Sequence, residues 1–313
     1  MFQLTTILIG CFGCTEVSDE TPAETTARVI AGGTFNCMLS TEGSLWCQDY
    51  ERADGKKIRR LGLPREHTFV DVVAGAYSAC GLTDEGEVKC WGHDNEGYVT
   101  ETPEGTWESI HGNNWGTCAT AGAGDWTCWG NPYPQETGPP QGQRFLQLEG
   151  ADWSFCGITE SQELLCWGRN DIQQAEPPLG TYTEIVAGDI GYSAKSTEGE
   201  WVWWGRNWYG EGDIPTDIEI IDLAFGSYHG CALDPQGKVH CWGAVDPDGE
   251  EPYRWQLDVP EDETFVSIDA NLWHTCGVTT EGDVRCWGCN TWRFPDYWEP
   301  EDHCNDPVPP WDR

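Results

Sequence analysis

The sequence predicts an all-β protein, namely a seven-bladed β-propeller with one disulfide inside the hairpin of most blades. Three observations lead to this prediction. A unit of about forty residues recurs along the chain, each unit places two cysteines at a fixed spacing, and the composition of 38 Gly and 19 Trp in 313 residues suits short strands and tight turns. Repeats of this length are typical of propellers and solenoids.

Each unit is defined by a cysteine, nine further residues and then Cys-Trp-Gly. Five copies are complete, with the pairs Cys80/Cys90, Cys118/Cys128, Cys156/Cys166, Cys231/Cys241 and Cys276/Cys286. The first copy has Cys37 and Cys47 without Trp-Gly, and the fifth has Ser193 and Trp203 in place of both cysteines. The seven copies begin 37 to 45 residues apart, so we expect seven blades.

The segments within a unit are typical of a small antiparallel sheet. A short apolar strand, such as 69–73 or 265–269, precedes a turn of small residues and then a hairpin. In the second unit Gly86 marks the hairpin turn, where a residue without Cβ most easily adopts a positive φ. The equivalent glycines are Gly43, Gly199, Gly237 and Gly282. The tryptophan of each Trp-Gly pair lies on a strand and is expected to have a structural role.

A hairpin places the two cysteines of its unit opposite each other, near the Cα separation of about 5.5 Å that a disulfide prefers. The fifth unit lacks both partners together, as pairing predicts. The two cysteines of one unit would supply only two of the four ligands of a structural zinc, so we expect six hairpin disulfides and no metal site. Outside the hairpins, we expect a bond between Cys289 and Cys304.

The N-terminal residues indicate export, a setting in which sixteen cysteines favour disulfides. Residues 1–13 form a short apolar run, and Leu8-Ile9-Gly10-Cys11 resembles a bacterial lipobox, whose cysteine is lipidated after cleavage. Lipidation at Cys14 instead would leave fourteen cysteines that can all pair, so both acceptors stay open. The run is short and contains no Lys or Arg, so a start further upstream also stays open.

The resulting domain prediction has four parts. We expect a signal peptide with lipobox at 1–14, a linker at 15–27, a propeller at 28–300 and a tail at 301–313. The protein would be extracytoplasmic, either lipid-anchored in the bacterial cell envelope or secreted, and a monomer.

The charge balance excludes some partners. The chain has 17 Lys and Arg against 53 Asp and Glu, a formal net charge of −36, so its field repels nucleic-acid phosphates. We expect no nucleic-acid binding and no cofactor. Calcium binding by acidic loops such as 246–250 stays open, although their spacing fits no EF-hand.

The units resemble repeats of the regulator of chromosome condensation family, whose pattern runs Gly-x-x-His-x-x-Ala-Leu and then Trp-Gly-x-Asn-x-x-Gly. Residues 226–233 match the first part and residues 204–210 the second. The resemblance implies a seven-bladed propeller in which the two ends of the chain complete a shared blade. It also points to secreted bacterial propellers, including inhibitors that clamp a β-lactamase with aromatic turn residues of one face.

Aromatic residues recur three positions before the first cysteine of a unit, in the turn that enters the hairpin. They are Tyr77, Trp115, Trp153, Tyr228 and Trp273, while Thr34 and Ile190 occupy the other two units. Equivalent turns of a propeller lie on one face, so we expect these five residues to bind a partner there. Packing between neighbouring blades is the alternative. Trp208, Trp255, Trp292, Trp298 and Trp311 lie in variable loops and are candidates for a second surface.

These features favour a non-catalytic surface protein that binds an unidentified protein partner, and recognition of carbohydrate by the same tryptophans is the alternative. No nucleophile elbow, phosphate loop or His-x-x-x-His pair is present, so we expect no catalytic residues and no enzyme. His229 and His274 occupy the family's histidine position and are expected to stabilise turns by hydrogen bonds.

Overall fold

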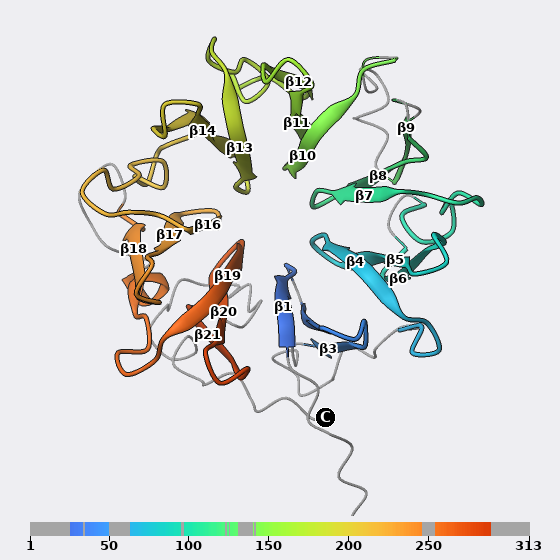
Figure 1. Ribbon diagram of the computed structural model, residues 1–313, viewed down its shortest axis with the longest axis horizontal. Helices are drawn as coiled ribbons and strands as arrows, with labels where there is room; N and C mark the ends of the chain where they lie inside the picture. Colours follow the sequence, from blue (N-terminus) through green and yellow to red (C-terminus); the bar gives the residue numbers. More distant parts are fainter. Residues whose placement is uncertain are drawn as a thin grey trace, which may run out of the picture.

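The computed structural model describes residues 26–33, 35–49, 63–94, 97–122, 124, 126–130, 140, 142–245 and 254–288. These residues form seven three-stranded sheets arranged radially around a central axis, together with the short 3₁₀-helix η2 (Arg254–Leu257) (Figure 1). The all-β, seven-bladed propeller is confirmed. Within the described ranges, no helix has the length and apolar character needed to cross a membrane.

Every sheet consists of three consecutive antiparallel strands, and the first strand of each sheet is the innermost and the third the outermost (Figure 1). The inner strands are β1 (Thr26–Ala31), β4 (Phe69–Ala74), β7 (Ser109–Gly112), β10 (Phe145–Ala151), β13 (Tyr182–Ala187), β16 (Asp222–Phe225) and β19 (Phe265–Asn271). The middle strands are β2 (Phe35–Ser40), β5 (Ser78–Thr83), β8 (Gly116–Thr120), β11 (Ser154–Thr159), β14 (Gly191–Ser196), β17 (His229–Leu233) and β20 (His274–Thr279). The outer strands are β3 (Leu45–Asp49), β6 (Val88–Gly92), β9 (Trp126–Gly130), β12 (Leu164–Gly168), β15 (Trp201–Gly205), β18 (Val239–Gly243) and β21 (Val284–Gly288).

The hairpin disulfides connect the middle and outer strands of six blades. Cys80 lies directly opposite Cys90 in the ladder, and the same register recurs in the other pairs. Six predicted bonds are therefore confirmed: Cys37–Cys47, Cys80–Cys90, Cys118–Cys128, Cys156–Cys166, Cys231–Cys241 and Cys276–Cys286. Their Cα atoms are 4.0 to 4.1 Å apart, closer than expected and nearer to the spacing of a non-hydrogen-bonded pair.

The hairpin turns use the predicted glycines. The backbone at Gly43, Gly86, Gly199, Gly237 and Gly282 has φ between 79° and 92°, which is the left-handed region that a Cβ disfavours. In the fourth blade the equivalent residue is Gln162, whose φ is 65°. This turn therefore holds a non-glycine residue in a left-handed conformation.

The hydrophobic core is divided among the seven interfaces between neighbouring blades. One cluster joins Phe35 of the first blade to Phe69 and Trp91 of the second, and another joins Val29 and Met38 of the first blade to residues of the seventh. The remaining five clusters each join one further pair of neighbouring blades. Burial between blades, rather than one central core, therefore holds the ring together.

The ring closes by direct contact between the first and seventh blades. The backbone N–H of Ala31 donates to Oδ2 of Asp269 at 2.8 Å, and Nε2 of His274 lies 2.8 Å from Oδ1 of Asn36. Within the described ranges every sheet contains only consecutive strands, so the shared blade implied by the family resemblance is not seen there.

Some tryptophans of the Trp-Gly pairs tie their blade to the loop that precedes it. The indole N–H of Trp129 donates to the carbonyl of Tyr98 at 3.1 Å, and that of Trp204 donates to the carbonyl of Gln174 at 3.1 Å. Both side chains are buried. Trp91, Trp167 and Trp287 are buried in the clusters between blades as well, so burial supports the structural role predicted for the tryptophans of the Trp-Gly pairs.

Candidate binding face

One face of the propeller carries the turns that join inner to middle strands, and we call it the turn face. All five predicted aromatic residues lie on it, each directly before a middle strand, and each is half-buried: Tyr77, Trp115, Trp153, Tyr228 and Trp273. Their placement on a single face follows from the equivalence of the seven turns.

Three of these residues form a continuous group across the second, third and fourth blades, which we call the first arc. The rings of Tyr77 and Trp115 meet edge to face with centroids 6.2 Å apart. Those of Trp115 and Trp153 stack with centroids 5.0 Å apart and an interplanar angle of 21°. The arc thus combines packing between blades with partial exposure to solvent. Packing between blades and binding of a partner, the two alternatives that the sequence offered for these residues, therefore do not exclude each other.

The second arc lies across the fifth, sixth and seventh blades. Its rings belong to Tyr209, Tyr228 and Trp273, with centroids 4.5 Å apart in the first pair and 4.8 Å in the second. Tyr209 comes from the loop after β15, because the outer strand also ends at the turn face. The sequence analysis missed this residue, although it lies within residues 204–210, which match the pattern Trp-Gly-x-Asn-x-x-Gly.

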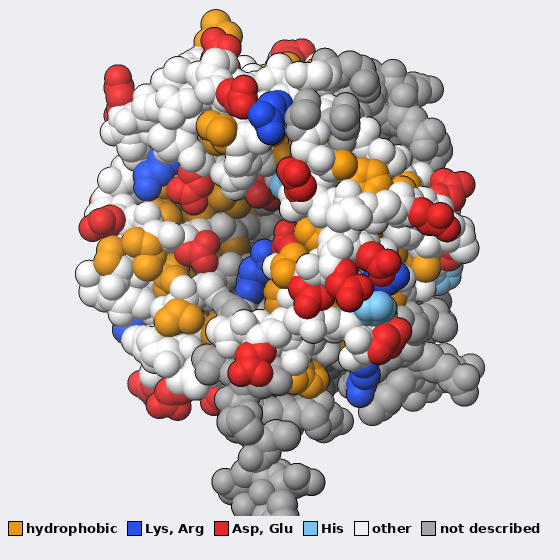
Figure 2. Space-filling model, turned by 45° about the vertical axis from the view of Figure 1, so that its right-hand side comes forward, with side chains coloured by type: hydrophobic (Ala, Val, Ile, Leu, Met, Phe, Trp, Pro, Cys, Tyr) orange, Lys and Arg blue, Asp and Glu red, His pale blue; other side chains and the backbone are white. Residues whose placement is uncertain are grey.

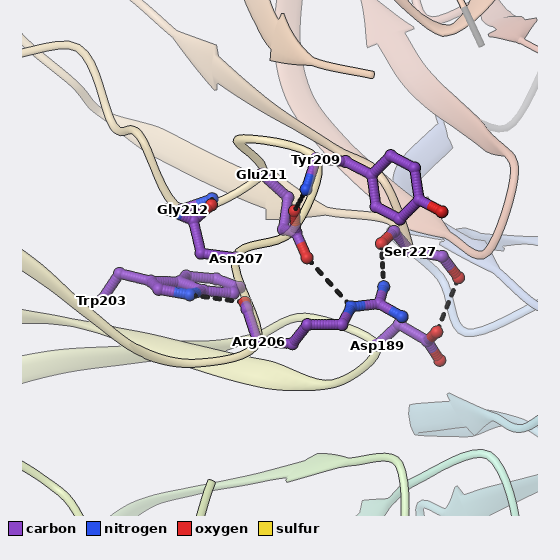
Figure 3. Close-up of polar contacts among 8 residues, drawn as sticks. All are labelled: Asp189, Trp203, Arg206, Asn207, Tyr209, Glu211, Gly212 and Ser227. Carbon is purple, nitrogen blue, oxygen red and sulfur yellow. Dashed lines mark hydrogen bonds and ion pairs between the residues drawn. The ribbon is translucent and has the colours of Figure 1, made fainter. Parts of the chain in front are cut away.

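A buried ion pair supports the second arc. Arg206, 9% exposed, donates from Nε to Oε1 of Glu211 at 3.0 Å and from Nη2 to the carbonyl of Ser227 (Figure 3). Its guanidinium carbon lies 5.4 Å from the ring centroid of Tyr228 and 5.6 Å from that of Trp208. The cation therefore lies beneath an aromatic surface, and Trp208 itself is 62% exposed.

A carboxylate lies beside the first arc. The indole N–H of Trp115 donates to Oδ1 of Asp152 at 2.5 Å. Burial and the nearby charge of Asp189 raise the pKa of Asp152 to about 7, against the opposing effects of the Trp115 bond and Arg169.

Asp189, in the turn of the fifth blade, bonds to turns of three other blades. Its carboxylate accepts hydrogen bonds from Nδ2 of Asn114 at 2.7 Å and from the hydroxyl of Ser227 at 2.6 Å, and its carbonyl accepts from the N–H of Asp152 at 2.6 Å. Burial raises the pKa of Asp189, although these bonds and Arg206 oppose the shift. The turn face is therefore held by polar contacts that no single blade could supply.

A central cavity of about 480 Å³ follows the axis and reaches the turn face. Figure 2 shows a hollow near the centre of the molecule, with acidic, basic and hydrophobic side chains around it. Seven carboxylates line the cavity: those of Asp71, Glu149, Glu184, Asp222 and Asp269 come from inner strands, and those of Asp152 and Asp189 come from the turns that follow β10 and β13. Arg28 also lines the wall and contacts Asp71 at 2.5 Å.

Several polar residues of this wall connect neighbouring blades. The Gln147 side chain donates to the carbonyl of Ile185 at 2.7 Å and accepts from its N–H at 3.0 Å. Asp222 accepts from the N–H of Ile268 at 2.9 Å. Burial, with a smaller contribution from Asp269 and Asp71, raises the pKa of Glu149 to about 7.

The two buried histidines also bond across blade interfaces. Nε2 of His229 lies 2.7 Å from the hydroxyl oxygen of Thr275 in the next blade, and His274 contacts Asn36 as described above. The expectation of structural hydrogen bonds is met, but the partner is the neighbouring blade rather than the residue's own turn. Burial lowers the pKa of His229 to about 3 and that of His274 to about 4.

Comparison with known families identifies the repeat. The model of the regulator of chromosome condensation (RCC1) repeat matches residues 69–97, 220–246 and 265–291, which lie in the second, sixth and seventh blades. The chain carries RCC1 repeats. The other four copies in this protein have the same strand order and register, so they are RCC1-like units in structure.

Two solved plant structures share the propeller fold of these RCC1 repeats. The ectodomain of the Physcomitrella patens receptor kinase CR4 is 21% identical, with a TM-score of 0.66 over 83% of this chain and 72% of that one. The CRINKLY WD40 ectodomain of the Arabidopsis thaliana receptor kinase ACR4 is 18% identical, with a TM-score of 0.65 over 85% of this chain and 96% of that one. Similarity at this level identifies the fold alone.

Some predicted features of this RCC1-repeat protein lie outside the described residues. They are the lipidation candidates Cys11 and Cys14, the pair Cys289 and Cys304, the acidic loop 246–250, Thr34, Trp292, Trp298 and Trp311. In the part of the chain that the structure describes, no three His, Cys, Asp or Glu residues are grouped so as to hold a metal ion.

Proposed function

We propose that this protein is an exported, non-catalytic binding protein that holds a protein partner against its turn face. The observation that carries the proposal is the placement of five half-buried aromatic side chains on one face of a ring, in two arcs of neighbouring aromatic rings. Aromatic residues are enriched among the side chains that dominate binding energies at protein interfaces.

The disulfides support export. Six cross-strand bonds persist only in an oxidising compartment, and the two plant structures with the same fold are ectodomains. A lipid anchor at Cys11 or Cys14 in a bacterial envelope, following a signal peptide within 1–14, is the finer form of the proposal. Metabolic labelling with a radioactive fatty acid, compared between Cys11→Ser and Cys14→Ser, tests it.

A pull-down tests the binding function. The full chain, immobilised through a C-terminal tag, is incubated with envelope and secreted proteins beside a variant with Trp115→Ala, Trp153→Ala and Trp273→Ala. We expect the parent to capture a protein that the variant does not, because truncating interface tryptophans removes binding energy of the order of 2 kcal/mol or more for each hot spot.

The matched control removes exposed apolar side chains from the opposite ends of the inner strands. Val70, Leu146 and Val266 are 57%, 63% and 55% exposed, and each is the second residue of its inner strand. The triple alanine variant of these residues should capture the same protein as the parent. Equal capture by parent and tryptophan variant, with both folded by circular dichroism, would refute the proposal.

Carbohydrate binding is a second candidate, favoured by the stacked and half-exposed indoles of Trp115 and Trp153 beside the Asp152 carboxylate. Indole faces stack on sugar rings, and carboxylates accept hydroxyl hydrogen bonds. Binding to a glycan array that free sugar competes away, together with no captured protein, would favour this candidate over the first.

A further inference from the structure

The central cavity opens on the turn face, between the two aromatic arcs. Turn residues Asn113, Asn114, Asp152, Asp189 and Leu272 belong to its lining, together with residues from all seven inner strands. Its volume of about 480 Å³ is large enough for a long side chain, so a partner that covers the arcs also covers an open cavity.

The wall of this cavity is strongly acidic. Its lining has seven carboxylates. Among the described residues that line it, Arg28 is the only lysine or arginine. Arg28 is engaged by Asp71, while Asp222 and Asp269 accept from the backbone N–H groups of Ile268 and Ala31. The backbone N–H groups satisfy oxygen lone pairs but supply no positive charge.

Some of these carboxylates raise one another's pKa. Besides burial, the charges of Asp269 and Asp71 contribute to the raised pKa of Glu149, and Asp189 contributes to that of Asp152. A positive charge that entered the cavity would relieve this repulsion.

The second arc shows how aromatic residues of this face accommodate a cation. There the guanidinium of Arg206 lies within 6.0 Å of three ring centroids while it bonds to Glu211. The first arc presents the same two kinds of group, because the stacked indoles of Trp115 and Trp153 lie beside Asp152. Aromatic rings with an adjacent carboxylate are a recognised setting for ammonium and guanidinium groups.

A buried amide in the cavity lining favours a peptide over a bare ion. Asn113 is 3% exposed, and its Oδ1 accepts from the N–H groups of Trp115 and Gly116 at 2.9 and 2.7 Å, which fixes the amide orientation. In the described part of the protein its Nδ2 has no hydrogen-bond partner. An unpaired buried donor is costly, and a peptide carbonyl can accept from it whereas a metal ion cannot.

We propose that the protein partner inserts a lysine or arginine side chain into the mouth of the central cavity, between the indoles of the first arc and the carboxylates of the inner strands. This inference rests on the proposed binding function and specifies the chemistry of the partner as a basic segment. The net charge of −36 attracts such a segment over a longer range.

The test uses a capped tetralysine peptide as probe, with a capped tetraserine peptide as the negative control. The dissociation constant is measured by calorimetry with the full chain at physiological salt. The channel variant carries Glu149→Gln and Asp152→Asn. The matched control carries Asp84→Asn and Glu85→Gln, which removes the same formal charge from the exposed β5–β6 turn on the opposite face.

We expect the channel variant to bind tetralysine at least about tenfold more weakly than the parent, and the control variant to bind within about twofold of it. Equal weakening in both variants would mean that only the overall field attracts the peptide, and parent-like binding by the channel variant would exclude the cavity; either result overturns the inference. If the channel variant does not fold, Glu149→Gln alone gives the same comparison against Glu85→Gln.

The pull-down distinguishes this failure from failure of the binding function. If the partner captured by the parent is lost from the tryptophan variant but retained fully by the channel variant, the turn face binds a protein and the cationic side chain is refuted. If nothing depends on the tryptophans, the proposed function itself is refuted.

Discussion

The indole N–H of Trp115 donates to Oδ1 of Asp152 at 2.5 Å, from one blade to the next. An aromatic residue of the proposed binding face is thereby coupled to a carboxylate whose pKa burial raises to about 7. Because this bond favours the charged carboxylate, the Trp115→Phe variant should raise the pKa of Asp152 further, by up to about one unit. Titration of the ¹³C carboxyl resonance in parent and variant measures it, and an unchanged pKa would contradict the coupling.

The buried carboxylates predict that mild acid stabilises the fold. The pKa of Glu149 and of Asp152 is raised to about 7, and that of Asp269 to about 6, so between about pH 7 and 4 the folded chain binds more protons than the unfolded chain. Stability therefore rises as the pH falls from 8 to 6.5, by up to about 1.4 kcal/mol per pH unit for each excess proton.

The buried histidines act in the opposite direction at lower pH. With the pKa of His229 at about 3 and that of His274 at about 4, these two side chains bind fewer protons in the folded chain than in the unfolded chain below about pH 6.5. The gain should therefore level off below that pH. Urea unfolding at pH 8, 6.5 and 5 measures both effects, and the Glu149→Gln, Asp152→Asn variant should lose most of the rise between pH 8 and 6.5. A parent whose stability falls over that interval would contradict this assignment.

Blade five replaces a disulfide with a packed tryptophan. Ser193 lies directly opposite Trp203, whose indole donates to the carbonyl of Arg206 at 2.8 Å and packs on Phe225 with centroids 4.7 Å apart. The ring covers Gly191 and Gly212, where an added Cβ would come within 2.5 Å of it.

We therefore expect the Ser193→Cys, Trp203→Cys variant to form its disulfide and still be less stable than the parent by about 1–2 kcal/mol. Removing a partly buried, packed indole costs up to about 3–5 kcal/mol, and closing so short a loop returns at most about 3 kcal/mol. Denaturant unfolding, with thiol titration to confirm the bond, measures the difference. A variant more stable than the parent would show that the indole contributes little.

A glycine in the fourth hairpin turn is predicted to stabilise the protein. Gln162 has φ of 65°, in the position that glycine occupies in the other described turns of this type, so Gln162→Gly should stabilise the protein by about 0.5–1 kcal/mol. The matched control is Gly199→Gln, where φ is 92° and no atom lies within 4 Å of an added Cβ; it should destabilise by a similar amount through backbone strain alone. Thermal unfolding of both variants measures this, and equal melting temperatures would contradict it.

Much of the blade could be predicted because its determinants are local. The spacing of Cys80 and Cys90 around Gly86 sets the hairpin register, and five glycines mark the turns that the structure shows at positive φ. The half-buried aromatic residues were also found, because their constant distance from the first cysteine assigns them to one face.

The site could be predicted only in part. Glu211, Asp152 and Asp189 were not singled out, because acidic residues are too numerous for any of them to stand out by type, and Arg206 was missed together with its partner Glu211. One signal was available: polar residues stand nine positions before the first cysteine position, on otherwise apolar inner strands, as at Asp71, Gln147 and Asp222. Their hydrogen bonds to a neighbouring blade explain that pattern.

The sequence by itself determined the number of blades, the order of strands and the pairing of six disulfides, because each depends on contacts within about forty residues that the repeat encodes directly. Only the tertiary structure decided which side chains converge on the axis. Asn114 and Asp189 are 75 residues apart and meet at 2.7 Å because closing the ring brings turns from different blades together. The acidic cavity and the two arcs arise in the same way, since seven inner strands that are distant in sequence share one axis.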